Sequence, residues 1–184
     1  GHTLDSVVGL RFEDRRLAGI PIPGHRSFHE VNLRFYVRRV AADGSMRRAV
    51  VAMNPTSGEM LWMHSEDEGV RGQNAIRNGA GRGLAYWADA KGADRRIIYV
   101  TPGYRLKALD ARNGHPITSF GTNGAVDLKL GANQEIDLNT GEMGLNATPL
   151  VIGDVVVVGM AHRPGTAPRT MRNAKGAGRG YDLR

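Results

Sequence analysis

Apolar and polar residues alternate most regularly over residues 31–38, where each odd position carries Val, Leu or Phe. This period of two is typical of a strand with one buried face. Asp43-Gly44 follows and predicts that this strand turns back as a hairpin into residues 46–51. Residues 7–12 predict a further strand, and the proline-punctuated residues 17–24 predict an extended segment.

A second hairpin is predicted over residues 97–109. Residues 97–100 are β-branched or aromatic, and residues 104–109 alternate imperfectly. Thr101-Pro102-Gly103 supplies the turn, because proline presets φ and glycine accepts a positive φ. The polar residues 110–113 then end at Gly114, where a turn closed by a left-handed residue favours glycine.

This polar turn has a copy earlier in the chain. The matching pairs, all at one offset, are Ala52 with Ala108, Asn54 with Asp110, and Gly58 with Gly114. Residues 180–184 begin a third copy, and residues 145–159 predict another hairpin that turns at Gly153-Asp154. Repeats of one β unit indicate a propeller or a solenoid, and generic hairpin chemistry is the alternative. The pattern as a whole predicts an all-β fold.

Several motifs in residues 52–184 carry a family resemblance. They are NPTSGEMLW, GRGLAYW, RIIYVTPGYRLKALDARNG, SFGTNGAVDLK, TGEMGLNATPLVIGDVVVVG and KGAGRGYDLR. This part of the chain resembles the pyrroloquinoline quinone (PQQ)-dependent dehydrogenases, which are eight-bladed β-propellers that oxidise alcohols and sugars. The resemblance implies a partial propeller of about two to three blades. The copied turn resembles that family's tryptophan-docking motif, which Trp62 completes and from which Thr118 departs.

The resemblance also implies cofactors, namely PQQ and Ca²⁺. Arg82, in RGLAYW, matches the family's arginine beside the quinone, and a guanidinium suits the carboxylates of PQQ; an ordinary surface arginine is the alternative. Asn146 or Thr148 matches the place from which a hydroxyl approaches the quinone, and both stay open. The family's Ca²⁺-ligating glutamate has no counterpart at residues 160–164. No metal ligand and no catalytic residue is therefore assigned to this chain.

The activity implied is oxidation of a small-molecule alcohol or sugar, with electrons passed to the quinone. The resemblance further implies a periplasmic protein, although residues 1–20 show no signal peptide. The alternative is a non-catalytic propeller-type scaffold fragment, or a chimera without activity of its own. Incomplete blades leave exposed edges, so self-association is expected.

Residues 1–51 differ from the rest and predict a separate β segment, giving domains at 1–51 and 52–184. The stretch VVGLRFEDRRLAGIPIPGHRSFHEVNLRFYVRR resembles an uncharacterised bacterial family with an acetoacetate-decarboxylase-like fold. Schiff-base chemistry would need a lysine, and residues 1–51 contain none. His25 and His29 lack a third ligand, so no metal site is expected there.

Composition narrows the remaining classes. The 184 residues carry 25 basic and 18 acidic groups and no cysteine, so neither a disulfide nor thiolate chemistry is available. The basic residues 163–184 have only Tyr181 among them to stack on a base, so no nucleic-acid partner is expected. The glycine-rich residues 72–83 lack the G-K-[ST] ending of a phosphate loop. No apolar run is long enough to predict a membrane span.

Overall fold

The structure, a computed structural model, forms two compact units, Gly1–Ala49 and Val50–Arg184. In the first unit it describes the strands, together with residues 42, 44 and 49, but no strand side chains. In the second unit it describes residues 50–75, 83–132, 135–144, 147–162 and 177–184. The regular secondary structure of the described residues is almost entirely β, as predicted. The prediction of a division at residue 51 stays a prediction.

The first unit consists of antiparallel strand pairs. These are β1 (Leu4–Phe12) with β4 (Phe28–Tyr36), β2 (Arg16–Leu17) with β3 (Ile20–Pro21), and β5 (Arg39–Val40) with β6 (Met46–Arg47). The strand expected over residues 31–38 is confirmed as far as Tyr36. Its expected return into residues 46–51 is wrong, because its partner is β1 and Gly44 lies between the short strands β5 and β6. A nine-residue partner offers β4 a longer ladder than residues 46–51 could.

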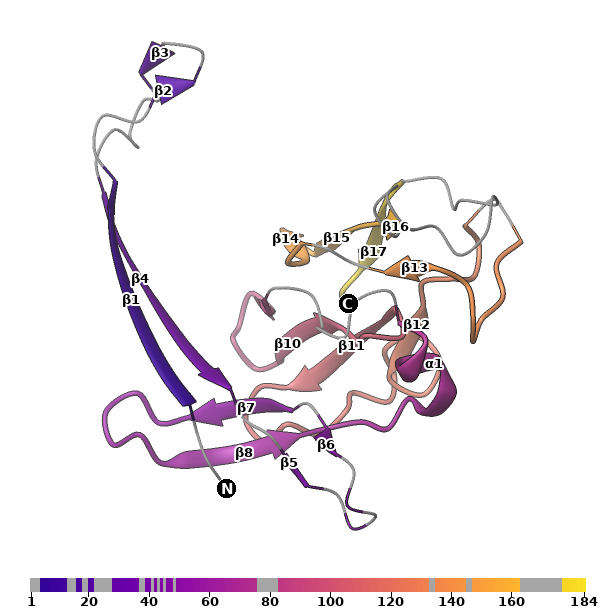
Figure 1. Ribbon diagram of the computed structural model, residues 1–184, viewed down its shortest axis with the longest axis horizontal. Coiled ribbons are helices and arrows are strands. Elements are labelled where there is room, and N and C mark those ends of the chain that lie inside the picture. Colours follow the sequence, from indigo (N-terminus) through magenta and orange to yellow (C-terminus); the bar gives the residue numbers. More distant parts are fainter. Residues whose placement is uncertain are drawn as a thin grey trace. The chain divides into compact units, whose positions relative to one another are not determined.

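The second unit is built around a four-stranded antiparallel sheet in the order β12-β11-β10-β9 (Figure 1). Its strands are β9 (Ala85–Ala88), β10 (Arg95–Val100), β11 (Arg105–Asp110) and β12 (Ala125–Asp127). Each strand pairs with the next along the chain, which is the arrangement of one propeller blade. The hairpin predicted over residues 97–109 is confirmed, with Ile98 opposite Ala108. The positive φ expected at Gly103 is wrong, because Tyr104 takes it instead, at 65°.

Smaller sheets flank this blade (Figure 1). They pair β7 (Val50–Met53) with β8 (Met60–His64), join β14 (Leu150–Ile152), β15 (Val155–Gly159) and β17 (Gly178–Asp182), and pair β13 (Met143–Gly144) with β16 (Ala161–His162). The turn predicted at Gly153-Asp154 is confirmed. No closed ring is formed by the described strands, so the second unit is a partial propeller, as the sequence predicts.

A single helical turn, α1 (Gly69–Gln73), was not predicted. Glu68 at its N-cap makes no capping hydrogen bond, and two of its five residues are glycine. Both features remove the usual sequence signals of a helix. The helix is held by tertiary contacts of Arg71, which are described below.

The apolar core lies on one face of the β9–β12 sheet. Ile98, Leu106 and Ala108 are completely buried, and they cluster with Val156 of the three-stranded sheet and with Leu183, which follows β17. This follows from the period of two, because alternate residues of paired strands share a face. Burial of this surface is the main stabilising contribution to the contact between the two sheets.

The predicted tryptophan docking is confirmed. Trp62 of β8 donates a hydrogen bond from Nε1 to the carbonyl oxygen of Ala111, at 3.1 Å. Its ring packs against Gly114, where a β-carbon would lie 2.4 Å from Cε3 of the indole. Gly114 has a φ of +73°. The glycine is therefore required both by the turn and by the tryptophan of the preceding sheet.

The second copy of the motif ends differently. Ile117 still bonds the carbonyl oxygen of Ala108, but the chain then leaves the ladder at Thr118 and returns to it as β12. Phe120, in this excursion, is 5% exposed and belongs to the core. An aromatic side chain two residues after the position of the motif's tryptophan is thus buried in the core.

Gly58 and Gly114 allow the docking contact to be measured. Both have a φ near +72°, but a β-carbon at Gly58 would meet nothing within 4 Å. Gly58→Ala should cost only the strain of a left-handed alanine, about 1 kcal/mol. Gly114→Ala should cost about 1–3 kcal/mol more, because its methyl group overlaps the indole. Urea unfolding of both variants tests this, and equal losses would show that Trp62 does not dock on Gly114.

Candidate functional site

β9 lies beside β14, and two contacts join the segments to which these strands belong. A β-carbon built on Gly83 would lie 2.6 Å from Oγ1 of Thr148. Further along both segments, Nε1 of Trp87 donates to Oδ1 of Asp154 at 3.1 Å. Because residues 83 and 87 meet residues 148 and 154 in the same order, the two segments run in the same direction. Their beginnings therefore lie at one end of the pair.

The three residues predicted to bind a cofactor belong to these beginnings. Thr148 is described and exposed, and it precedes the buried Pro149. Arg82, immediately before Gly83, and Asn146, two residues before Thr148, lie outside the described residues. The structure thus brings Thr148 against the residue that follows Arg82. His25 of the rejected metal pair also lies outside the described residues.

The other face of the β9–β12 sheet carries charged side chains, and residues 66–71, which follow β8, lie against it. Glu68 accepts hydrogen bonds from Thr101 Oγ1 and from the Gly103 backbone N–H, both at 2.6 Å. The same carboxylate is 3.2 Å from Nη1 of Arg105. A β-carbon at Gly103 would lie 2.6 Å from Oε1 of Glu68, so the turn can approach the carboxylate this closely only without a side chain.

Arg71 of α1 makes the most deeply buried ion pair among the described residues. Its side chain is 3% exposed, and Nη1 and Nη2 each donate to one oxygen of Asp127 at 2.7 Å. Nε donates to the carbonyl oxygen of Gly103 at 2.6 Å. This two-pronged geometry is the strong form of an arginine–carboxylate contact. It fixes α1 on the end of the sheet.

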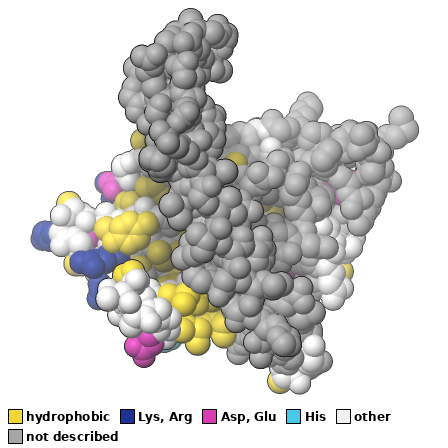
Figure 2. Space-filling model, turned by 60° about the vertical axis from the view of Figure 1, so that its left-hand side comes forward, with side chains coloured by type: hydrophobic (Ala, Val, Ile, Leu, Met, Phe, Trp, Pro, Cys, Tyr) yellow, Lys and Arg dark blue, Asp and Glu magenta, His cyan; other side chains and the backbone are white. Residues whose placement is uncertain are grey.

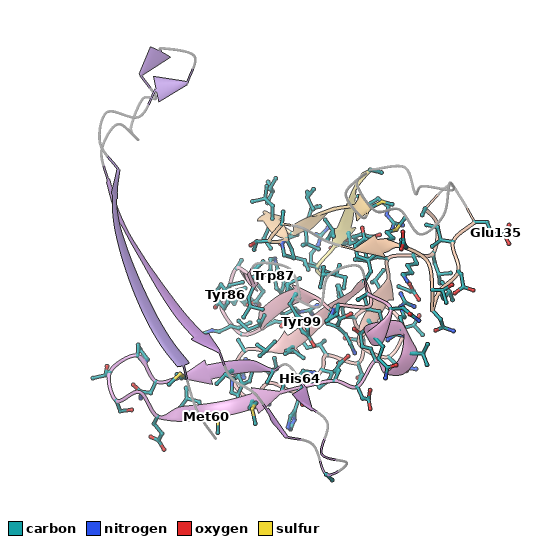
Figure 3. All side chains as sticks on the ribbon, viewed as in Figure 1. Met60, His64, Tyr86, Trp87, Tyr99 and Glu135 are labelled. Atoms are coloured by element: carbon teal, nitrogen blue, oxygen red, sulfur yellow. The ribbon has the colours of Figure 1, made fainter. Side chains whose placement is uncertain are left out.

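A third group extends the charged face. Oε1 of Glu66 lies 2.6 Å from Nζ of Lys107 and 3.1 Å from Nε2 of His64. The rings of His64 on β8 and Tyr99 on β10 meet edge to face at 6.4 Å (Figure 3). Burial raises the pKa of Tyr99, and the nearby carboxylates Glu66 and Glu68 raise it further. Tyr99 therefore stays a neutral phenol.

Two further groups have shifted acidities. Burial alone would raise the pKa of Asp127, but hydrogen bonds from Arg71 and from the Lys129 backbone outweigh burial and lower it. Burial, with the charge of Arg71, lowers the pKa of Lys129 to about 8. Nζ of Lys129 donates to the carbonyl oxygen of Leu138 at 3.0 Å. Glu66, Glu68 and Asp127 each form an ion pair with a basic side chain. These ion pairs attach the segment that follows β8 to the charged face of the sheet.

Sequence reasoning missed this charged face. The sequence does contain a signal of these ion pairs. Glu66 and Glu68 have the same two-residue spacing as their partners Lys107 and Arg105. Arg179, one of the basic residues in 163–184, lies in β17 and donates to the carbonyl oxygens of Leu128 and Leu130. In the described part of the chain, no three His, Cys, Asp or Glu side chains gather as a metal site. No helix there could span a membrane.

The ion pair of Arg71 and Asp127 predicts a pH dependence. Because folding lowers the pKa of Asp127, the pair contributes stability above the unfolded carboxyl value of about 4. That contribution is lost as the pH falls through the folded value. Asp127→Asn should lower the free energy of unfolding at pH 7 by about 3 kcal/mol, and the difference from wild type should shrink in acid.

Urea unfolding at several pH values measures both effects. Glu59→Gln removes an exposed carboxylate and is the control, expected to change the free energy of unfolding at pH 7 by less than about 0.5 kcal/mol. A difference between Asp127→Asn and wild type that stays constant into acid would contradict the assignment.

Comparison with known proteins identifies two regions. Residues 39–184 match the family model described as "PQQ: Glucose/ethanol/alcohol dehydrogenase, beta-propeller domain". Residues 1–63 match one described as "Uncharacterized conserved protein". The acetoacetate-decarboxylase-like fold expected for residues 1–51 stays a prediction.

Two curated relatives are glycerol dehydrogenase large subunits. The chain is 28% identical to that of Gluconobacter thailandicus over 114 residues, which are 59% of this chain and 15% of the relative. It is 27% identical to that of Gluconobacter oxydans (strain 621H) over 119 residues, which are 62% and 15%. The match thus spans about 15% of the length of these relatives. With the family match covering most of its residues, the chain belongs to the β-propeller family of the PQQ-dependent glucose, ethanol and alcohol dehydrogenases.

Proposed function

We propose that the second unit supplies part of the PQQ site of a dehydrogenase that oxidises a small-molecule alcohol or sugar. The observation that carries the proposal is the contact of Gly83 with Thr148, since it joins the two segments to which the candidate residues belong. The glycerol dehydrogenase relatives support an alcohol as substrate. Family membership supports the cofactor.

The residues at this place fit PQQ chemically. PQQ carries carboxylates and carbonyl oxygens, which accept hydrogen bonds from a guanidinium and from a hydroxyl. Arg82 would hold a carboxylate, and Thr148, which is exposed, or Asn146 would donate to another oxygen. When bound, PQQ supplies the redox chemistry by accepting the electrons of the alcohol. The part of this chain is to bind and orient the quinone.

The remaining parts of the proposal rest on resemblance. The catalytic base and the ligands of Ca²⁺ are assigned to no residue of this chain. The family resemblance supports a periplasmic location. An acetoacetate-decarboxylase-like fold is proposed for residues 1–51 on their motif alone.

A non-catalytic scaffold is the second candidate, and one observation favours it. The carboxylates Glu66, Glu68 and Asp127 are all engaged with basic side chains inside the second unit. Burial alone would raise the pKa of Glu66 and of Asp127, but their basic partners outweigh burial and lower it, so both carboxylates are poor general bases. If the chain binds no PQQ, a scaffold function is the better explanation.

Arg82 provides the test of the PQQ site. Arg82→Lys should raise the PQQ dissociation constant about ten-fold, because lysine cannot form a planar fork with a carboxylate. Arg82→Ala should raise it further. Fluorescence titration with PQQ measures the effect, and Arg95→Lys, at an exposed arginine on β10, is the matched control.

An unchanged dissociation constant in Arg82→Ala would show that Arg82 is only a surface residue. Failure of the wild-type chain itself to bind PQQ would favour the scaffold function.

We also propose that the chain associates with itself through the outer face of the three-stranded sheet. Leu150 and Ile152 are 58% and 60% exposed, and they stand opposite Val157 and Val155. Figure 2 also shows exposed hydrophobic side chains, coloured yellow, on the left of the view. A contiguous apolar face of this kind favours association.

Charges on this face should prevent the association. Leu150→Glu with Ile152→Lys should shift the chain toward monomer in sedimentation velocity, because each charge would have to be buried in the contact. Val70→Lys, at an equally exposed position on α1, is the control. Association that is unchanged in the double variant would show that another surface is responsible.

A further inference from the structure

We infer that Gly83 is a positioning residue of the cofactor site, because the lack of a side chain there lets Thr148 pack on the backbone. This contact sets the spacing between the segment that carries Arg82 and the segment that carries Thr148. The expected effect on PQQ binding rests on the proposed function, whereas the contact between Gly83 and Thr148 does not.

The need for glycine at position 83 is steric. A β-carbon there would lie 2.6 Å from Oγ1 of Thr148 and 3.2 Å from its Cγ2. The backbone of Gly83 is not in the left-handed region, so conformation does not demand glycine. The nearest atoms belong to a β-branched side chain, which has little freedom to turn away. Glycine is therefore required here by one neighbour, Thr148.

The far ends of the two strands are fixed separately. Trp87 is 5% exposed, donates to Asp154, and has the guanidinium of Arg96 at 5.1 Å from its ring centroid. With this end held, a side chain at position 83 would push apart only the near ends. The change would thus fall on Gly83 and on Thr148, the candidate cofactor residue that the structure describes.

Thermal unfolding of the unliganded chain tests the contact. Gly83→Ala should lower Tm by about 5 °C. Adding Thr148→Ser should restore most of the loss, because serine has one γ atom and can turn it away. Adding Thr148→Val should restore little, because valine keeps the shape of threonine. Gly178→Ala is the control, since a β-carbon there would meet nothing within 4 Å.

Titration with PQQ tests the positioning. Gly83→Ala should raise the dissociation constant about ten-fold, and the added Thr148→Ser should return it to within about three-fold of wild type. Thr148→Ser retains the hydroxyl, so relief of the collision and loss of a hydrogen bond are separated. The added Thr148→Val should leave binding weak.

The outcomes are distinct. A Gly83→Ala variant that melts within about 1 °C of wild type, or a rescue by valine equal to that by serine, overturns the inferred contact. A rescue by serine of Tm but not of PQQ binding overturns the positioning role. If the wild-type chain binds no PQQ, the proposed function and the positioning role both fail, while the melting series still decides the contact.

Discussion

The second unit depends on the burial of both faces of the β9–β12 sheet. One face is apolar and packs Ile98 and Leu106 into the core shared with Val156. The other carries Arg105 and Lys107 and is covered by the chain around Glu66 and Glu68. Apolar contact is tolerant of small shifts, whereas a carboxylate must meet its partner within hydrogen-bonding distance. The apolar face therefore supplies most of the adhesion, and the charged face fixes the position of the covering chain.

The contacts of the charged face explain how α1 and the residue before it become ordered, although their sequence lacks the usual signals of a helix. Glu68 and Arg71 both bind the turn at Gly103. Glu68 accepts a hydrogen bond from the backbone N–H of Gly103, and Arg71 donates one to its carbonyl oxygen. Their charges are also compensated, by Arg105 and by Asp127. A buried ion pair adds little net stability over an apolar contact, but removal of one partner is costly. Such a network thus selects one arrangement of the segment more than it strengthens the fold.

The sequence predicts those features that are local or repeated. The hairpin at Thr101 and the turn that ends at Gly114 follow from turn chemistry, whereas the docking of Trp62 follows from the family resemblance of the copied motif. The partner of β4 and the ion pair of Arg71 with Asp127 join residues distant in sequence, and a local pattern does not contain such pairings. Of the candidate site, the family resemblance suggests Arg82 and either Asn146 or Thr148, and these stay predictions. The contact of Thr148 with Gly83 joins connections that lead into two different sheets, and a local pattern does not contain it.

The candidate site depends both on the sheets and on the connections that lead into their strands. Gly83 lies in the connection that leads into β9, and Thr148 lies in the connection that leads into β14. Trp87 of β9 is tied by a hydrogen bond to Asp154, in the turn after β14. A site held in this way takes its precision from the sheets and its chemistry from the connections. Substitutions in the connections would then change binding with little effect on the sheets. Substitutions at the tie between the strands would change both, because the spacing of the connections is set there.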